Sequence, residues 1–282
     1  MKISVVIEPL ESRALLSVAA LPRYDHVVIV VEENHSYESV LGSSSLPTIG
    51  LMPIGSDDPY IRSLAKNGAS FTKISGITHP SEPNYLAMFS GSTQGVTSDA
   101  PPKKLLKARS LGGELIAAVH SFAGYSEALP STGSTITQSH GYSRSHNPWS
   151  EFADVPASAN LPFSAFPTDY RKLPTVSFVV PTKSNDMHSG SISTADKWLK
   201  TNLGGYAKWA PTHNSLLIVT WAGGSGGNHI PTIFYVAHIA PGKYSEPLSH
   251  YNTLRTLEDM YGLTPLGKSA GKTTAIRDVF TK

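Results

Sequence analysis

The stretch HVVIVVEEN, residues 26–34, joins five β-branched apolar residues to two acids and an asparagine. Such a run is typical of a strand that is buried on both faces of a parallel sheet. In open α/β sheets ligands bind beyond the carboxyl ends of the strands, where Glu33 and Asn34 would lie. Their oxygen atoms suit Mg²⁺, Ca²⁺ or Mn²⁺, but the same two residues could simply cap the following turn.

Three further short apolar runs predict buried strands at 175–181, 216–221 and 231–239. Between them, apolar spacing with polar or glycine residues at the ends predicts helices. Because strands and helices alternate, the sequence predicts an α/β fold with a mostly parallel central sheet and helices on both faces. The expected helices cover 56–71 with Gly68 as the stop, 81–91, 111–122, 194–210 and 249–263.

Two of these helices carry more specific expectations. The helix at 194–210 is expected to be interrupted at Gly204 and Gly205. The helix at 81–91 is expected to have Ser81 at its N-cap, beside free backbone N–H groups. That position suits a hydroxyl that only caps the helix, and it also suits a nucleophile that attacks a phosphoryl group.

The composition limits the classes of function. With 282 residues the chain is long enough for one large α/β domain. Its 23 basic and 21 acidic residues give a net charge of +2, which is too balanced to indicate a nucleic-acid partner. No apolar run approaches the roughly 20 residues that a membrane-spanning helix requires. The absence of cysteine excludes disulfides, thiolate nucleophiles and cysteine-based zinc sites.

The beginning of the chain differs from the rest. Glu8 and Glu11 interrupt its apolar stretch, so it matches a signal peptide poorly. The piece LESRALLS resembles a short N-terminal motif of exported proteins in some bacteria. We therefore expect residues 1–22 to be a leader or export segment and residues 23–282 to form a single domain. The protein is expected to be exported or associated with the cell envelope; a disordered leader is the alternative.

Polar residues in two other segments could carry chemistry. Asp186 and His188 directly follow a predicted strand, so they are expected at the functional edge of the sheet. His146 and Arg144 lie in segment 126–170, whose lack of periodicity is typical of a functional insertion. A lone histidine is more often an ordinary core or surface residue, and only convergence at one edge favours a site.

Five motifs occur in one order along residues 26–265, nearly the whole chain. They make the sequence resemble the bacterial phosphoesterase family of acid phosphatases and non-specific phospholipases C, whose fold is alkaline-phosphatase-like. The motifs are EENHSYESVLG, HPSEPNYLAMFSGS, SRSHNPWSEF, PTKSNDMHSGSI and HYNTLRTLEDMYGL.

This resemblance implies roles for individual residues. Glu33, Asn34 and Ser81 would bind a catalytic divalent metal ion: Mg²⁺, Ca²⁺, Mn²⁺ or Zn²⁺. Ser81 would be the nucleophile that becomes phosphorylated, and the sequence shows no base adjacent to it. The residues that would bind the transferred phosphoryl group or protonate the leaving oxygen are His146, Asp186 and His188. Those that would contribute to substrate binding are Asn84, Arg144, Asn147 and His250.

The stretch TWAGGSGGNH, residues 220–229, departs from the family pattern. Relatives carry an Asp-Glu pair that completes the metal site, whereas this chain has Ala222 and Gly223. Because carboxylates supply much of the affinity for hard cations, weaker metal binding is expected. Asn228 and His229 are candidates for replacement ligands, and an imidazole would favour Zn²⁺ or Mn²⁺. A plain flexible turn is the alternative.

Three hypotheses about function remain open at this point. The first is a hydrolase of phosphomonoesters or phospholipid-type phosphodiesters that uses Ser81 and a divalent metal and is impaired by the loss of the acidic pair. The second is a catalytically inactive family member that binds a phosphorylated ligand. The third is an enzyme disabled by alteration of the metal loop. The expected ligand is a small phosphorylated substrate or a phospholipid headgroup.

Overall fold

Strand β1 (His26–Glu32) lies near the centre of a nine-stranded sheet, between β10 (Ser215–Trp221) and β9 (Val176–Val180), and runs parallel to both. This computed structural model describes residues 20–42, 48–49, 52–53, 57–236 and 238–281. Every residue of β9 and β10 is buried, as is all of β1 beyond its first residue. The apolar runs therefore form the core of the sheet, as the sequence predicted.

The remaining strands extend this sheet on both sides. Its order is β12-β4-β11-β10-β1-β9-β5-β8, with β13 also paired to β4. Only β11 is antiparallel to its neighbours, so the predicted mostly parallel sheet is confirmed. The outer strands are β4 (Ala69–Ser75), β5 (Phe122–Ser126), β8 (Asn160–Pro162), β11 (His229–Tyr235), β12 (Gly242–Tyr244) and β13 (Leu248–Ser249).

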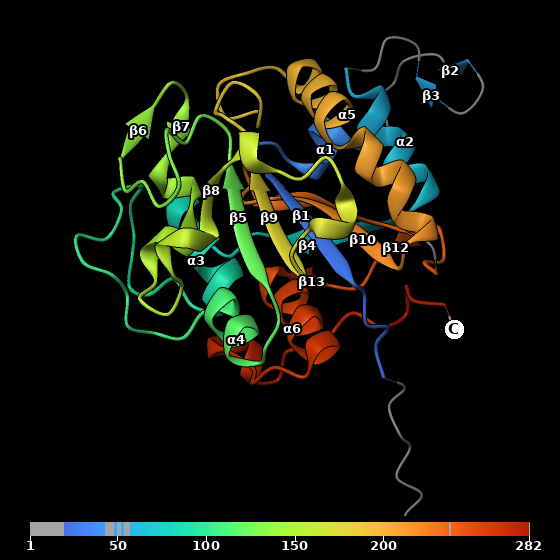
Figure 1. Cartoon of the computed structure of the whole chain (residues 1–282). Coiled ribbons are helices and arrows are strands. Elements are labelled where there is room, and N and C mark those ends of the chain that lie inside the picture. Colours follow the sequence, from blue (N-terminus) through green and yellow to red (C-terminus); the bar gives the residue numbers. More distant parts are fainter. Residues whose placement is uncertain (1–19, 43–47, 50–51, 54–56, 237, 282) are drawn as a thin grey trace, which may run out of the picture.

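Helices pack against the sheet in two groups (Figure 1). One group contains α2 and α5, and the other contains α3, α4 and α6. Phe89 of α3 packs edge-to-face on Phe178 of β9, which fixes α3 against the central strands. The helices are α1 (Tyr37–Val40), α2 (Pro59–Asn67), α3 (Ser81–Ser90), α4 (Leu111–Ala117), α5 (Ile192–Trp209) and α6 (His250–Tyr261).

Two expectations about helices are wrong. Helix α5 continues through Gly204 and Gly205 without a break. A Cβ at Gly205 would lie 2.4 Å from the hydroxyl oxygen of Tyr170, so glycine is needed for this close approach. At α3 the N-cap is Pro80, and Ser81 is the first helical residue.

The irregular segment 126–170 is ordered by short 3₁₀ turns and a small hairpin. The hairpin pairs β6 (Gln138–Ser139) with β7 (Tyr142–Ser143), and the turn Arg144–His146 follows at once. The Asn160 side chain accepts hydrogen bonds from Asn147 Nδ2 and Trp149 Nε1, both at 2.9 Å. These contacts hold the segment against the sheet beside the end of β5.

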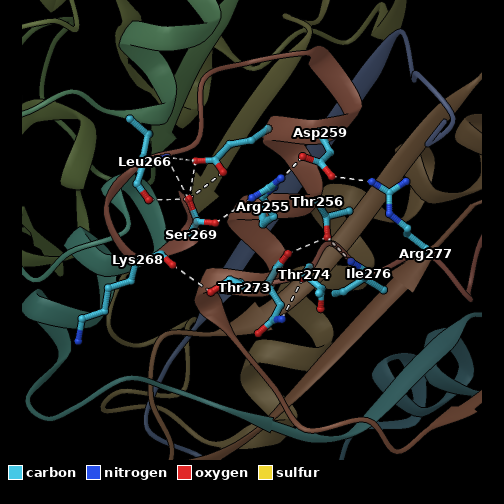
Figure 2. Close-up of polar contacts among 12 residues, drawn as sticks. Arg255, Thr256, Asp259, Leu266, Lys268, Ser269, Thr273, Thr274, Ile276 and Arg277 are labelled. Atoms are coloured by element: carbon cyan, nitrogen blue, oxygen red, sulfur yellow. Dashed lines mark hydrogen bonds and ion pairs between the residues drawn. The ribbon is translucent and has the colours of Figure 1, made fainter. Parts of the chain in front are cut away.

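The segment after α6 ties that helix down (Figure 2). The hydroxyl of Ser269 lies 2.7 Å from Glu258 Oε2, and the Leu266 N–H donates to Glu258 Oε1 at 2.8 Å. Arg255 and Arg277 both pair with Asp259. We call these contacts of Glu258 and Asp259 with the following segment the lock. It holds α6, whose first residue, His250, contacts the chain at the end of β10.

Most of the predicted leader, residues 1–19, lies outside the described residues. A two-stranded ladder joins β2 (Thr48–Ile49) and β3 (Met52–Pro53). Among the described residues, no helix combines the length and the apolar character needed to cross a bilayer.

Candidate active site

The site is built around the carboxyl end of β1. The backbone N–H of Glu33 donates to the Asp186 carbonyl at 2.7 Å, which joins the chain after β1 to the chain after β9. The hydroxyl of Ser81, in the first turn of α3, donates to Glu33 Oε2 at 2.8 Å. The sequence indicated no base next to Ser81; the structure places a buried carboxylate there. No sequence pattern signals this contact, because the two residues are 48 positions apart.

Two imidazoles complete the surroundings of Glu33. Its Oε1 lies 3.6 Å from His146 Nε2, and its Oε2 lies 3.8 Å from His188 Nδ1. Burial alone would raise the pKa of Glu33, but His146, and the hydrogen bonds of His188 and Ser81, outweigh burial and hold that pKa below its usual value. The Glu33 carboxylate is therefore charged while fully enclosed.

His146 is held by a second carboxylate and an aromatic ring. Its Nδ1 lies 3.3 Å from Asp186 Oδ2, and its ring stacks on Tyr85 with centroids 5.2 Å apart. Burial works to lower the pKa of His146, but the charges of Glu33 and Asp186 raise it overall. Burial raises the pKa of Asp186, and its bond to His146 only partly offsets this. Tyr85 was not singled out in the sequence, although it stands within the SEPNY motif.

His188 is the more open of the two imidazoles, with its side chain 29% exposed. Asn34 Nδ2 donates to His188 Nδ1 at 3.1 Å, and the His188 backbone N–H donates to Asp186 Oδ1 at 2.8 Å. Asn34 and Met187 both have left-handed backbone conformations, with φ of 54° and 74°. Such conformations in residues other than glycine cluster at functional sites.

Glu33, His146 and His188 could hold a metal ion. Each offers one ligand atom, and these atoms lie within 4.8 Å of one another. Glu33 Oε1 is buried and has no hydrogen-bond partner, as expected of an oxygen reserved for a cation. The sequence had assigned Glu33, Asn34 and Ser81 to the metal; the structure adds the two imidazoles as candidate ligands.

The four residues predicted to bind substrate make supporting contacts. Asn84 Oδ1 accepts the backbone N–H groups of Ile77 and Thr78 at 2.8 and 3.0 Å, just before Ser81. His250 Nε2 donates to the Ala222 carbonyl at 2.7 Å, and burial lowers the pKa of His250 to about 4. Arg144 pairs with Glu151, and Asn147 donates to Tyr142 Oη and Asn160 Oδ1. Their role in substrate binding stays a prediction.

The glycine-rich loop after β10 packs against the segment that precedes Ser81. Asn228 Oδ1 accepts the Gly224 N–H at 2.8 Å, and Asn228 Nδ2 donates to the Thr78 carbonyl at 2.9 Å. A Cβ at Gly223 would lie 3.0 Å from Asn84 Nδ2, so any larger residue would press on that side chain.

His229 does not join the Glu33 cluster in the way expected of a replacement ligand. Its Nδ1 lies 2.6 Å from Glu38 Oε1, and its Nε2 donates to the Thr72 carbonyl at 2.9 Å. Its ring also stacks on Tyr37, with centroids 4.9 Å apart. Both ring nitrogens are thus used to tie β11 to α1 and β4.

The comparisons with known proteins agree with this geometry. The Phosphatidylinositol-3-phosphatase of Mycobacterium tuberculosis is 49% identical over 256 residues, which cover 89% of this chain and 82% of that protein. The Phosphate-repressible acid phosphatase of Penicillium chrysogenum is 28% identical over 234 residues, 75% of this chain but only 56% of the relative.

The fold is likewise shared with solved structures. A Vibrio parahaemolyticus protein in the alkaline phosphatase superfamily superposes with a TM-score of 0.58 at 14% identity, covering 91% of this chain and 74% of that one. The likeness confirms the alkaline-phosphatase-like fold. The model of the Phosphoesterase family matches residues 54–264, about three quarters of the chain. The chain therefore belongs to the Phosphoesterase family.

Proposed function

We propose that this protein hydrolyses phosphomonoesters through Ser81. The observation that carries the proposal is the 2.8 Å hydrogen bond from the Ser81 hydroxyl to the buried carboxylate of Glu33. The hydroxyl also stands in the first turn of α3, where the helix dipole favours negative charge. The relative named Phosphatidylinositol-3-phosphatase supports a phosphorylated inositol lipid as the substrate class.

The residues divide the work of phosphoryl transfer among them. Ser81 Oγ attacks phosphorus while its proton passes to Glu33 Oε2, and the bond from phosphorus to the leaving oxygen breaks. The leaving oxygen takes a proton from a water molecule, and the resulting hydroxide attacks phosphorus. The bond from phosphorus to Ser81 Oγ then breaks, the proton on Glu33 returns to that oxygen, and inorganic phosphate is released. Asp186 fixes the ring of His146, and Asn34 fixes that of His188, so that both imidazoles keep their orientation toward Glu33.

Glu33, His146 and His188 would hold a divalent metal ion. A carboxylate with two imidazoles suits Zn²⁺ or Mn²⁺ better than Mg²⁺ or Ca²⁺. When bound, the ion would neutralise charge on the phosphoryl oxygens and favour ionisation of the serine hydroxyl. Without a metal, the same imidazoles would be free to contact the phosphoryl group or to protonate the leaving oxygen. An imidazole that binds the metal ion cannot also act on the phosphoryl group. Whether hydrolysis requires a metal ion therefore distinguishes these two roles.

The test is hydrolysis of a chromogenic phosphomonoester from about pH 4 to 9, the range in which such acids and bases titrate. It is run with chelator and then with each of the four metal ions. Ser81→Ala is expected to lower kcat by roughly 1000-fold or more, as for other nucleophiles. Ser98→Ala, an exposed serine, is the control. Activity in Ser81→Ala equal to that of the control would refute the assignment.

A catalytically inactive protein that binds a phosphorylated ligand is the second candidate. The presence of Ala222 and Gly223 in place of the acidic pair favours it. In this case inorganic phosphate would raise the melting temperature while no metal restores turnover. Turnover that depends on Ser81 would exclude it.

A further inference from the structure

Segment 101–109, PPKKLLKAR, presents positive and apolar side chains to solvent. Lys103, Lys104 and Lys107 are exposed, and none of them forms an ion pair with any residue in the described part of the chain. Leu105, between them, is 52% exposed. These three lysines attract anionic headgroups, and an exposed leucine between them can enter the interface of a bilayer.

The segment is held so that these side chains stay outside. The Leu106 N–H donates to the Glu151 carbonyl at 2.7 Å, and the Leu106 carbonyl accepts from the Ala153 N–H at 2.9 Å. Leu106 thus anchors the backbone while Leu105 and Lys107 on either side remain exposed. Pro101 and Pro102 restrict the preceding backbone, which lowers the entropy lost on binding.

The segment also lies near the proposed nucleophile. Asp99 Oδ1 accepts the backbone N–H of Glu82 at 3.0 Å, and Glu82 is the residue after Ser81. Four residues of chain reach at most about 14 Å, so the Cα of Lys103 lies within that distance of Asp99.

A second exposed apolar residue is tied to the same region. Ile136 is 43% exposed, and Arg144 donates its backbone N–H to the Thr137 carbonyl beside it at 2.9 Å. The Arg144 side chain in turn pairs with Glu151, the residue that anchors Leu106. Both exposed segments are therefore fastened to the turn that carries His146, on the side of the molecule where Figure 1 labels β6 and β7.

We propose that Lys103, Lys104, Leu105, Lys107 and Ile136, here named the basic rim, dock this protein on an anionic phospholipid bilayer. The proposal rests on the proposed function, because docking would bring Ser81 to a phosphorylated lipid headgroup. Each lysine near an anionic surface strengthens binding about fivefold, so three of them contribute roughly 100-fold. The apolar side chains of Leu105 and Ile136 enter the interface between the headgroups.

The experiment measures co-flotation of the full chain with vesicles of phosphatidylcholine, with and without phosphatidylserine and phosphatidylinositol 3-phosphate. The rim variant replaces Lys103, Lys104 and Lys107 by Gln. The matched control replaces Lys197, Lys200 and Lys208, three exposed lysines of α5, and changes the net charge equally. The rim variant is expected to lose roughly 100-fold in affinity for anionic vesicles, and the control to lose little. Leu105→Asn is expected to weaken binding more than Ile116→Asn, at an exposed site on α4.

Hydrolysis of a soluble phosphomonoester is measured in parallel, because it reports on the proposed function without the rim. It is expected to be equal in the wild type and in both triple variants. Equal losses of vesicle binding in the rim and control variants would overturn the proposal, as would failure of the wild type to bind anionic vesicles. If only the rim variant loses vesicle binding, docking is supported even where the soluble phosphomonoester is not hydrolysed. The proposed docking and the proposed function can therefore fail separately.

Discussion

Among single residues, Asn228 shows how the glycine-rich loop after β10 is connected to the rest of the site. Its side chain connects the Gly224 N–H to the Thr78 carbonyl, and Asn84 Nδ2 donates to the same carbonyl at 2.6 Å. Two amides thus hold the short segment that leads into Ser81. The loop is therefore joined by hydrogen bonds to the backbone that leads into Ser81.

Replacement of Asn228 is expected to disturb Ser81 without touching it. The φ of Asn228 is 58°, so Asn228→Gly keeps the backbone relaxed and removes only the side chain. It should lower the free energy of unfolding by about 1–2 kcal/mol and kcat by roughly tenfold, with little change in KM. Asn228→Asp can still accept the Gly224 N–H, so its stability and its kcat should lie between those of the wild type and of Asn228→Gly. Steady-state kinetics check this, with Asn67→Gly as an exposed control; an unchanged kcat in Asn228→Gly would contradict it.

The sequence could identify residues that gather at this edge of the sheet but not the bonds between them. Glu33, Asn34, Asp186 and His188 follow strands, and their convergence follows from a parallel sheet. The contact between Ser81 and Glu33 depends on how α3 docks, which is tertiary packing and leaves no local pattern. The same holds for His229, whose partners come from two other elements.

Among the elements, α6 shows how a distant segment can support the site. His250 at its first turn holds the Ala222 carbonyl, and the segment after the helix locks its other end (Figure 2). Glu258 and Ser269, at the centre of the lock, are both fully buried. Burial raises the pKa of Glu258, and the hydrogen bond from Ser269 only partly offsets this.

Removal of the Ser269 hydroxyl is expected to destabilise the whole chain. Ser269→Ala leaves the buried Glu258 carboxyl with one partner fewer, which costs about 1–3 kcal/mol. Urea unfolding of the purified protein measures this loss. Thr273→Ala, whose hydroxyl makes one exposed bond to the Lys268 carbonyl, is the control and should change stability by less than about 0.5 kcal/mol. Equal stabilities of the two variants would show that the lock does not hold α6.

Prediction of the elements succeeded where the pattern is local and failed where packing overrides it. The run at 26–32 reads as a strand because five apolar β-branched residues follow one another. Strand β5, FAGYS, lacks such a run, and β4 begins directly after the predicted helix stop at Gly68, so the sequence predicts neither strand. Helix α5 passes through two glycines, and at Gly205 the Tyr170 hydroxyl occupies the place that a Cβ would take.

For the whole molecule, the number of buried carboxyl groups decides how stability responds to pH. Burial raises the pKa of Glu82 to about 8 and that of Glu151 to about 7, although Arg144 pairs with Glu151. Burial also raises the pKa values of Asp58 and Asp196. At a pH between its unfolded and its folded pKa, each of these carboxyl groups keeps a proton in the folded protein that the unfolded chain has released.

This difference gives the pH dependence its sign. Between about pH 4.5 and 8 the unfolded chain binds fewer protons than the folded protein, so the free energy of unfolding falls as the pH rises. Each buried carboxyl group contributes its full stabilisation below the pKa it has in the unfolded chain. This stabilisation is lost as the pH rises through the pKa it has in the folded protein. The lowered pKa values of Glu33 and His250 act in the opposite direction, because the unfolded chain takes up these protons before the folded protein does, and they limit stability in acid. We therefore expect a maximum in mildly acidic solution.

The melting temperature is accordingly expected to be several degrees higher near pH 5 than near pH 8, a shift of a few kcal/mol in unfolding free energy. Glu82→Gln removes one of the titrating groups, so it should raise the melting temperature near pH 8 and flatten the profile. Glu246→Gln, at an exposed acid, is the matched control and should leave the slope as it is. A melting temperature that rises from pH 5 to pH 8 would mean that the buried carboxyls are ionised in the folded protein. The charge of Arg144 would then have to outweigh the burial of Glu82 and Glu151.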